Sequence, residues 1–390
     1  MMDPAGILWW PPSAVVLITA TAVATVSLLA LVRATLWPRR GKVLPSPLRT
    51  VIPAASRADL DKLVYQPDIF PGARDVDTPY GSVRVYEFGP EDGQKVLFVH
   101  GISTSCITLS RIAHALVERG CRVMLYDLFG RGFSDGVGDL PHDARLYSSQ
   151  ILCVLASSSL AWTGADAVRL VGYSLGGAIA VHFANAFPHL VSSLVLLAPA
   201  GLIRPESFGT VARFVFSSGV VPEPILARVT RRRLQKPIAA SRLSKNAAVA
   251  VSEASNLGEK GETTPLEDRV LEYVRWMVLH HQGFVPAFMS CVRFAPLTEQ
   301  HGAWRQLANR RPGTTAVLLA ETDEIIDLDD YTREGLPLAG GKDSVVWRVM
   351  PGSHDFVMTH VEPIMNELDE LWGMEKRPCS DPCSSGGPKV

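Results

Sequence analysis

The sequence predicts an α/β fold with a mostly parallel central sheet, helices on both faces of that sheet, a helical cap and one N-terminal transmembrane helix. Three observations support this prediction. Short apolar runs alternate with amphipathic stretches between residues 83 and 201, and this pattern resumes after residue 312. The alternation stops across residues 202–312, where the segments have a helical pattern. Residues 14–32 form an uncharged apolar run near the N-terminus.

The apolar run of residues 14–32 would span about 28 Å as a helix, close to the hydrocarbon thickness of a bilayer. A signal peptide carries its positive charge before the apolar run, but here only Asp3 precedes it. We therefore interpret the run as an uncleaved anchor, with a buried helix or an atypical signal peptide as the alternative. The charges that follow it are Arg33, Arg39, Arg40, Lys42 and Arg49. By the positive-inside rule, this single-pass topology leaves the rest of the chain in the cytosol.

The remaining elements follow in order along the chain. After the N-terminal segment of residues 1–32, the sequence predicts a proline- and arginine-rich linker over 33–80. A first core segment covers 81–201, a helical cap 202–312, a second core segment 313–375 and a disordered tail 376–390. The expected strands are residues 83–88, 95–100, 123–126, 168–172, 193–197, 315–320 and 345–349. The expected core helices are residues 110–120, 144–162, 175–187 and 363–374.

Bulk composition excludes several classes of protein. Of the 390 residues, 47% are hydrophobic and 20% are charged, so the chain is neither wholly disordered nor fibrous. The formal net charge of −1 gives no reason to expect a nucleic-acid partner. The six cysteines are too few for a disulfide scaffold, and none has zinc-ligand spacing with a histidine. We expect no metal and no cofactor, and protein partners stay open.

One motif carries the chemistry. Ser174 lies in Gly-Tyr-Ser-Leu-Gly-Gly (172–177), between an expected strand and an expected helix. Gly-x-Ser-x-Gly in that context is typical of a tight turn that exposes a nucleophilic serine. The amide of Leu175 is the first expected donor to an oxyanion, and the amide of Ile102, in the loop after the strand at 95–100, is the second. We expect His100 to orient that loop rather than to act as a base.

The acid and the base are expected after later strands. Asp323 follows the strand at 315–320 and is favoured as the acid over Glu321, Glu324 and Asp327. His354 follows the strand at 345–349 and is expected to be the general base. We expect His360 to flank the next helix.

These motifs, in this order, resemble the α/β-hydrolase superfamily over about residues 80–375. They are His100-Gly101, the loop 127–135 (Asp-Leu-Phe-Gly-Arg-Gly-Phe-Ser-Asp), the serine motif, Asp323 and Gly-Ser-His at 352–354. The resemblance is to the single-cap branch of esterases, monoacylglycerol lipases, carbon–carbon bond hydrolases and thioesterases. The N-terminal anchor is similar to that of membrane-bound monoacylglycerol lipases. Relatives that act as dehalogenases or epoxide hydrolases carry Asp where this chain has Ser174, so both are disfavoured.

The resemblance departs at Ala320, where the family usually has Gly, and at Thr359, where acyltransferase relatives carry an acid. Together with the anchor and the apolar cap, the resemblance implies a membrane-anchored serine hydrolase that acts through an acyl-enzyme on Ser174. Its substrate is expected to be a small hydrophobic carboxylic ester, either lipid-like or an acylated metabolite. A thioesterase or carbon–carbon bond hydrolase with the same triad is an alternative. So are an acyltransferase and a non-catalytic ligand-binding protein on this fold.

Overall fold

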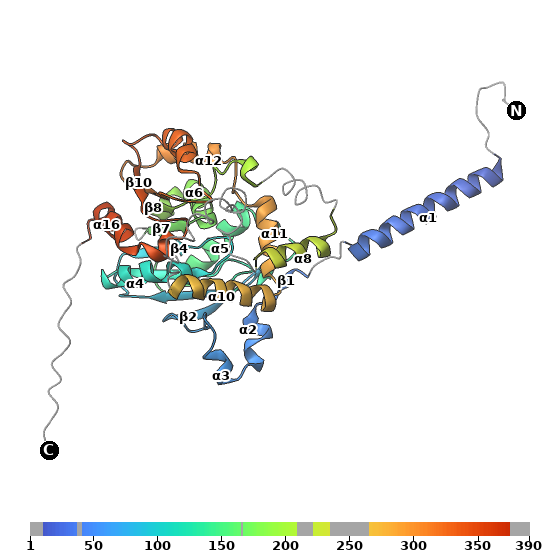
Figure 1. Ribbon diagram of the computed structural model, residues 1–390, viewed down its shortest axis with the longest axis horizontal. Helices are drawn as coiled ribbons and strands as arrows, with labels where there is room; N and C mark the ends of the chain where they lie inside the picture. Colours follow the sequence, from blue (N-terminus) through green and yellow to red (C-terminus); the bar gives the residue numbers. More distant parts are fainter. Residues whose placement is uncertain (1–10, 37–40, 165–166, 209–220, 235–264, 375–390) are drawn as a thin grey trace, which may run out of the picture.

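The central sheet has eight strands in the order β10-β9-β8-β7-β4-β5-β3-β2. The computed structural model describes residues 11–36, 41–164, 167–208, 221–234 and 265–374 (Figure 1). Neighbours from β10 to β5 are parallel, whereas β3 pairs antiparallel with β5, and β2 with β3. The strands are β2 (Ala73–Thr78), β3 (Gly81–Phe88), β4 (Lys95–Val99), β5 (Arg122–Tyr126), β7 (Val168–Tyr173), β8 (Val191–Leu197), β9 (Thr315–Ala320) and β10 (Val346–Met350). The predicted fold class is confirmed.

The middle strands are continuous apolar runs because both of their faces are covered. Nearly all residues of β4, β7, β8 and β9 are buried, as expected for parallel strands between two helical layers. Helix α4 (Ser110–Glu118) packs against α16 (Val361–Trp372), and α5 (Ala144–Ala156) packs against α6 (Leu175–Ala186). Helices therefore cover both faces of the sheet.

Helix α5 ends six residues before its expected end, and two serines explain why. The Ser157 hydroxyl donates to the carbonyl of Val154 at 2.7 Å and the Ser158 hydroxyl donates to Glu87 Oε1 at 2.9 Å. Serine side chains that bond to nearby backbone or to other side chains favour helix ends over helix interiors.

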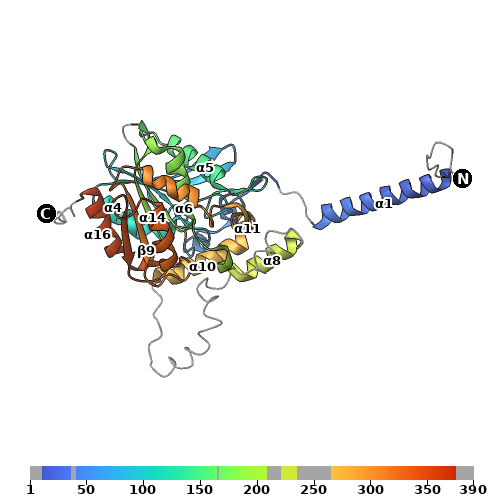
Figure 2. The ribbon, with the colours of Figure 1, turned by 90° about the horizontal axis from the view of Figure 1, so that it is seen from above.

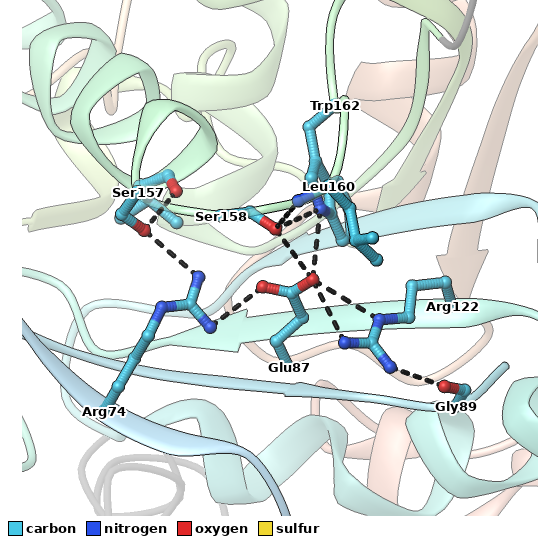
Figure 3. Close-up of polar contacts among 9 residues, drawn as sticks. Arg74, Glu87, Gly89, Arg122, Ser157, Ser158, Leu160 and Trp162 are labelled. Carbon is cyan, nitrogen blue, oxygen red and sulfur yellow. Dashed lines mark hydrogen bonds and ion pairs between the residues drawn. The ribbon is translucent and has the colours of Figure 1, made fainter. Parts of the chain in front are cut away.

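Glu87 on β3 is the centre of a buried ionic cluster (Figure 3). Its Oε2 lies 2.8 Å from the Arg74 guanidinium on β2, and its Oε1 lies 3.2 Å from that of Arg122 on β5. Oε1 also accepts from the Ser158 hydroxyl and, at 3.3 Å, from the indole N–H of Trp162. The cluster thus joins the three strands at one edge of the sheet to the segment after α5.

Residues 43–80 are more structured than the expected linker. Strand β1 (Val43–Leu44) pairs with β6 (Gly136–Val137), and short helices α2 (Pro47–Thr50) and α3 (Arg57–Leu60) follow. The side chains of Tyr65 and Phe70 are buried in the core, and β2 is the edge strand of the sheet. The sequence analysis did not predict β2 because its charged residues interrupt the apolar pattern of a strand. Only an edge strand tolerates such charges so readily.

The insertion between β8 and β9 is mainly helical where the structure describes it. It contains α8 (Glu223–Leu234), α10 (Pro265–His280), α11 (Phe284–Phe294) and α12 (His301–Gln306), together with short 3-10 turns. A single parallel bridge between Ile203 and Thr298 ties its two ends together. Helix α12 packs against α6 and so returns the chain to the core. Residues 209–220 and 235–264 of the expected cap, and the expected tail, lie outside the described residues.

Helix α1 (Pro12–Leu36) extends away from the domain (Figures 1 and 2). Its apolar stretch is long enough to cross a membrane, and none of that stretch is buried against the rest of the chain. The hydroxyls of Thr19, Thr21 and Thr25 each donate to the carbonyl four residues earlier, at 2.8 Å. Each of these hydroxyls therefore has a hydrogen-bond partner within the helix itself.

Candidate active site

Ser174 lies on a sharp turn between β7 and α6, and its backbone has φ 55° and ψ −118°. Such a positive φ is rare for a residue with a side chain and is found where the surrounding structure imposes it. The surrounding glycines explain the turn. A Cβ at Gly172 would lie 2.4 Å from the Gly176 carbonyl oxygen, one at Gly176 would lie 2.0 Å from the Val99 oxygen, and one at Gly177 would lie 2.6 Å from Pro199 Cβ. Only glycine fits at these three positions.

Two other predicted residues meet Ser174. His354, on the loop after β10, has its Nε2 3.0 Å from Ser174 Oγ. Its Nδ1 lies 2.8 Å from Oδ2 of Asp323, on the loop after β9. Because the carboxylate can only accept, Nδ1 carries the proton and Nε2 accepts from the serine hydroxyl. The three side chains therefore form one continuous chain of hydrogen bonds.

The competing carboxylates have other positions. Asp323 Oδ1 accepts from the amides of Ile325 and Ile326 at 2.8 Å each, so its side chain, only 1% exposed, is held on both oxygens. Asp327 caps α13 (Leu328–Asp330) by accepting from the Asp330 amide at 2.9 Å. Glu324 accepts from the backbone N–H of His354 at 3.3 Å and so supports the histidine loop. Glu321 is exposed. Of the four, only Asp323 has a hydrogen bond to the imidazole among the bonds described.

Two residues that the sequence analysis did not single out hold this site. The Tyr173 hydroxyl donates to the His354 carbonyl at 3.0 Å, and the two rings lie 5.3 Å apart. Burial raises the pKa of Tyr173 well above its usual value, so it stays a donor. Arg131, fully buried in the loop after β5, donates from Nε to the carbonyl of Ile102 at 2.9 Å. Its Nη1 also donates to the Phe129 carbonyl and to the Tyr147 hydroxyl, and its Nη2 donates to Cys291 Sγ on α11.

The loop after β4 lies beside the serine. A Cβ at Gly101 would be 3.5 Å from Ser174 Cβ, an ordinary van der Waals distance, so the loop runs in contact range of the serine. Leu175 is the first residue of α6, and its N–H therefore has no carbonyl partner within the helix. His100 is fully buried, with Nε2 accepting from the Leu128 amide and Nδ1 bonded to the Gly101 carbonyl. Burial lowers its pKa to about 3, so it is a neutral residue that orients the loop.

The loop 127–135 is bound from both of its ends. Asp127 accepts from the Tyr65 hydroxyl at 2.9 Å, from the Phe133 amide at 3.0 Å and from the Cys106 amide at 3.2 Å. Asp135 accepts from the amides of Ser46 and Ser82. These contacts join the loop to β3 and to the start of α2, and they give it a structural part in supporting the site. Within the described ranges, no group of three or more His, Cys, Asp or Glu side chains is arranged to hold a metal ion.

Comparisons with known proteins agree with the fold. A family model described as serine aminopeptidase, S33, matches residues 90–263. Solved structures that share the fold include a bromoperoxidase from Bacillus anthracis, with a TM-score of 0.55 and 16% identity over 77% of this chain and 99% of that one. Another is the carboxylesterase CesB from Bacillus subtilis, with a TM-score of 0.53 and 17% identity over 79% and 93%. The chain has the α/β-hydrolase fold.

Among curated relatives, lipase LipV from Mycobacterium tuberculosis is 31% identical over 149 residues, or 38% of this chain and 54% of that protein. Monoglyceride lipase from Mus musculus is 28% identical over 137 residues, or 34% and 45%. The chain spans about half or less of the length of the curated relatives it matches. The family-model match contains Ser174 and Ile102 and ends before Asp323 and His354. The grouping of Ser174, Asp323 and His354 rests on the geometry.

Proposed function

We propose that this α/β-hydrolase is a membrane-anchored serine hydrolase that cleaves a hydrophobic carboxylic ester. The observation that carries the proposal is the hydrogen-bonded chain from Ser174 through His354 to Asp323. A serine hydroxyl is a weak nucleophile unless a neighbouring base removes its proton, and this imidazole is positioned to do so.

The proposed reaction has two steps. His354 Nε2 takes the Ser174 proton while Oγ attacks the ester carbonyl, and the alcohol leaves with a proton returned by the imidazolium. Water, activated by the same nitrogen, then attacks the acyl-enzyme and releases the acid. Asp323 holds the imidazole tautomer and stabilises its positive charge. The amides of Ile102 and Leu175 are proposed to donate to the oxyanion in both steps.

Two observations favour a lipid-like substrate. Relatives in the matched region include proteins named as a lipase and a monoglyceride lipase. The apolar helix α1 would hold the site next to a bilayer, where such esters partition. The basic residues after α1 favour a domain on the cytosolic side.

Labelling with a fluorophosphonate probe tests the serine. We expect the full-length protein in detergent to label, Ser174→Ala to lose labelling, and the matched control Ser192→Ala, on an exposed position of β8, to label like wild type. Equal labelling of wild type and Ser174→Ala would refute the nucleophile. A panel of p-nitrophenyl esters and acyl-coenzyme A thioesters of several chain lengths then identifies the bond cleaved.

The anchor is tested separately. We expect the full chain to stay with membranes in alkaline carbonate, and a chain lacking residues 1–36 to be released. Protease added outside sealed microsomes should digest the C-terminal tail. A protected tail would place the domain on the other side.

A further inference from the structure

We propose that the outward face of helix α8 binds the surface of an anionic lipid bilayer and so fixes the orientation of the hydrolase domain below its anchor. This inference rests on the membrane anchoring proposed above. It concerns a helix of the inserted segment that has no part in the hydrogen-bonded site.

Helix α8 has two different faces. Leu226, Thr230 and Leu234 are buried against the domain. On the other side, Ile225 is 55% exposed and Val229 is 59% exposed, one helical turn apart. Four exposed arginines lie around and beyond this apolar pair: Arg228, Arg231, Arg232 and Arg233. A helix that presents apolar side chains flanked by arginines is typical of one that lies in a membrane interface.

The fixed position of α8 makes this face a surface feature of the domain. Glu223, at the start of α8, forms an ion pair with Arg293 on α11. Helix α8 also packs along α11 and α10. The one acidic residue of the helix is thus paired with its neighbour α11, and the outward face carries positive charge only.

The chain between anchor and domain places the membrane close to α8. Strand β1 starts at Val43, seven residues after the end of α1 at Leu36, so at most about 25 Å of extended chain joins them. Strand β1 pairs with β6, and a Cβ on Gly136 of β6 would lie 2.7 Å from Gly283 Cα, at the start of α11. The tether therefore ends beside the helix on which α8 packs. Both ribbon views show α8 at the end of the domain nearest α1 (Figures 1 and 2).

The charge of this region favours anionic lipid over other occupants. The chain as a whole has a formal net charge of −1, so the four arginines of α8 are a local concentration of positive charge. Basic residues also follow α1 directly in the sequence, and they would lie at the same membrane surface. Polybasic segments next to a membrane helix are attracted to anionic headgroups within a Debye length of the surface. The apolar pair between them suits insertion at the headgroup boundary.

A site-specific fluorophore tests contact with lipid. In the full chain, Cys153, Cys379 and Cys383 are first replaced by serine. A polarity-sensitive label is then attached at Val229→Cys. The control carries the label at Val349→Cys on the edge strand β10, where the wild-type valine is 47% exposed. Each is reconstituted in vesicles of phosphatidylcholine or of phosphatidylcholine with one quarter phosphatidylserine. Doxyl-labelled lipid should quench the Val229→Cys label at least twofold more strongly with phosphatidylserine, and leave the Val349→Cys label unchanged. Equal quenching at the two positions, or quenching without dependence on phosphatidylserine, would overturn the proposal.

Charge variants give the second readout. Replacing the four α8 arginines by glutamine in the Val229→Cys chain should abolish the dependence on phosphatidylserine. A matched set at other exposed arginines should preserve it: Arg57, Arg145, Arg305 and Arg311→Gln. The α8 variant should also hydrolyse a bilayer-embedded ester several-fold more slowly but a soluble p-nitrophenyl ester at the wild-type rate. If the wild-type chain did not hydrolyse the soluble ester, the proposed function would be contradicted. If alkaline carbonate released the wild-type chain from membranes, the anchor would be contradicted. Unchanged quenching in the α8 variant contradicts the lipid-binding face alone.

Discussion

Two buried carboxylates in this molecule have different partners. The side chain of Glu87 is 5% exposed and faces the guanidinium groups of Arg74 and Arg122. The side chain of Asp323 is 1% exposed and faces the imidazole of His354. Arginine is permanently charged, so the Glu87 cluster pairs one carboxylate with two fixed cations and holds strands together. An imidazole has one nitrogen that can donate a proton and one that can accept it, so the Asp323 pair can support proton transfer. The partner decides which role a buried carboxylate can take.

For the Asp323 pair, the largest expected effect is the loss of kcat in Asp323→Asn. An amide at this position can donate to Nδ1 and so favours the wrong imidazole tautomer, which should lower kcat about 10⁴-fold. Steady-state kinetics on a p-nitrophenyl ester measures the loss. Thermal unfolding of the same preparation should stay close to wild type. A variant with nearly full activity would mean that another carboxylate orients His354.

Glu87→Gln should give the opposite pattern. It leaves two largely buried guanidinium groups without their anion, which should cost about 3 kcal/mol of unfolding free energy. The apparent melting temperature should fall by roughly 5–10 °C, while kcat per folded molecule stays within about twofold. Glu367→Gln is the control, since its 3.0 Å pair with Arg348 is more exposed and should contribute little. If Glu87→Gln and Glu367→Gln had equal melting temperatures, the Glu87 cluster would contribute no more to stability than the more exposed pair.

Arg131→Lys tests whether Arg131 positions the Ile102 loop of the site without contacting the substrate itself. Lysine cannot bond at once to Ile102, Tyr147 and Cys291, so the Ile102 loop should lose its position. We expect kcat to fall by about 10- to 100-fold with little change in KM, because the proposed oxyanion donor acts mainly in the transition state. Tyr147→Phe, which keeps the bond to Ile102, should leave kcat nearly unchanged. A lower melting temperature with normal kcat would show that Arg131 only stabilises the fold.

The smallest effect concerns pH and a third buried carboxylate. Burial raises the pKa of Asp127 to about 6 and lowers that of His100 to about 3 and that of His281 to about 4. Near pH 5 the unfolded chain therefore binds about two more protons at the histidines, and the folded chain binds about one more at Asp127. The net uptake of about one proton on unfolding means that these groups lower stability by about 1.4 kcal/mol for each unit the pH falls.

Asp127→Asn removes the opposing contribution and should make that slope roughly twice as steep. Unfolding of the detergent-solubilised chain between pH 6 and pH 4.5, followed by near-ultraviolet circular dichroism, measures both slopes. Equal slopes in wild type and variant would mean that Asp127 has no raised pKa.

The sequence predicted those features that depend on local pattern. The turn at Ser174 was predictable because its glycines and its flanking strand and helix are contiguous, and the order of the later loops followed from the strand pattern. The choice of Asp323 among four carboxylates was a prediction that the geometry supports, since only the folded loop shows which side chain meets the imidazole.

Other features could not be predicted from the sequence because they join residues that are far apart in the chain. Arg131 meets Cys291 and Glu87 meets Trp162, pairs separated by 160 and 75 positions. The strand at Ala73–Thr78 was missed because its charged side chains do not alternate with apolar ones as those of a half-buried strand do. Its assignment needed the pairing with β3.

That charged edge strand also bears on how copies of this protein meet. Strand β2 ends the sheet, and an edge strand can pair with the same edge of a second molecule. Asp75 and Asp77 are exposed there. Copies held in one membrane, as proposed above, would diffuse in a plane and present their edges at a common height, which raises the frequency of such encounters. Asp75 and Asp77 are ion-paired with Arg84 and Arg49. Edge-to-edge pairing would have to desolvate these charged side chains, so crowding would be less able to start aggregation.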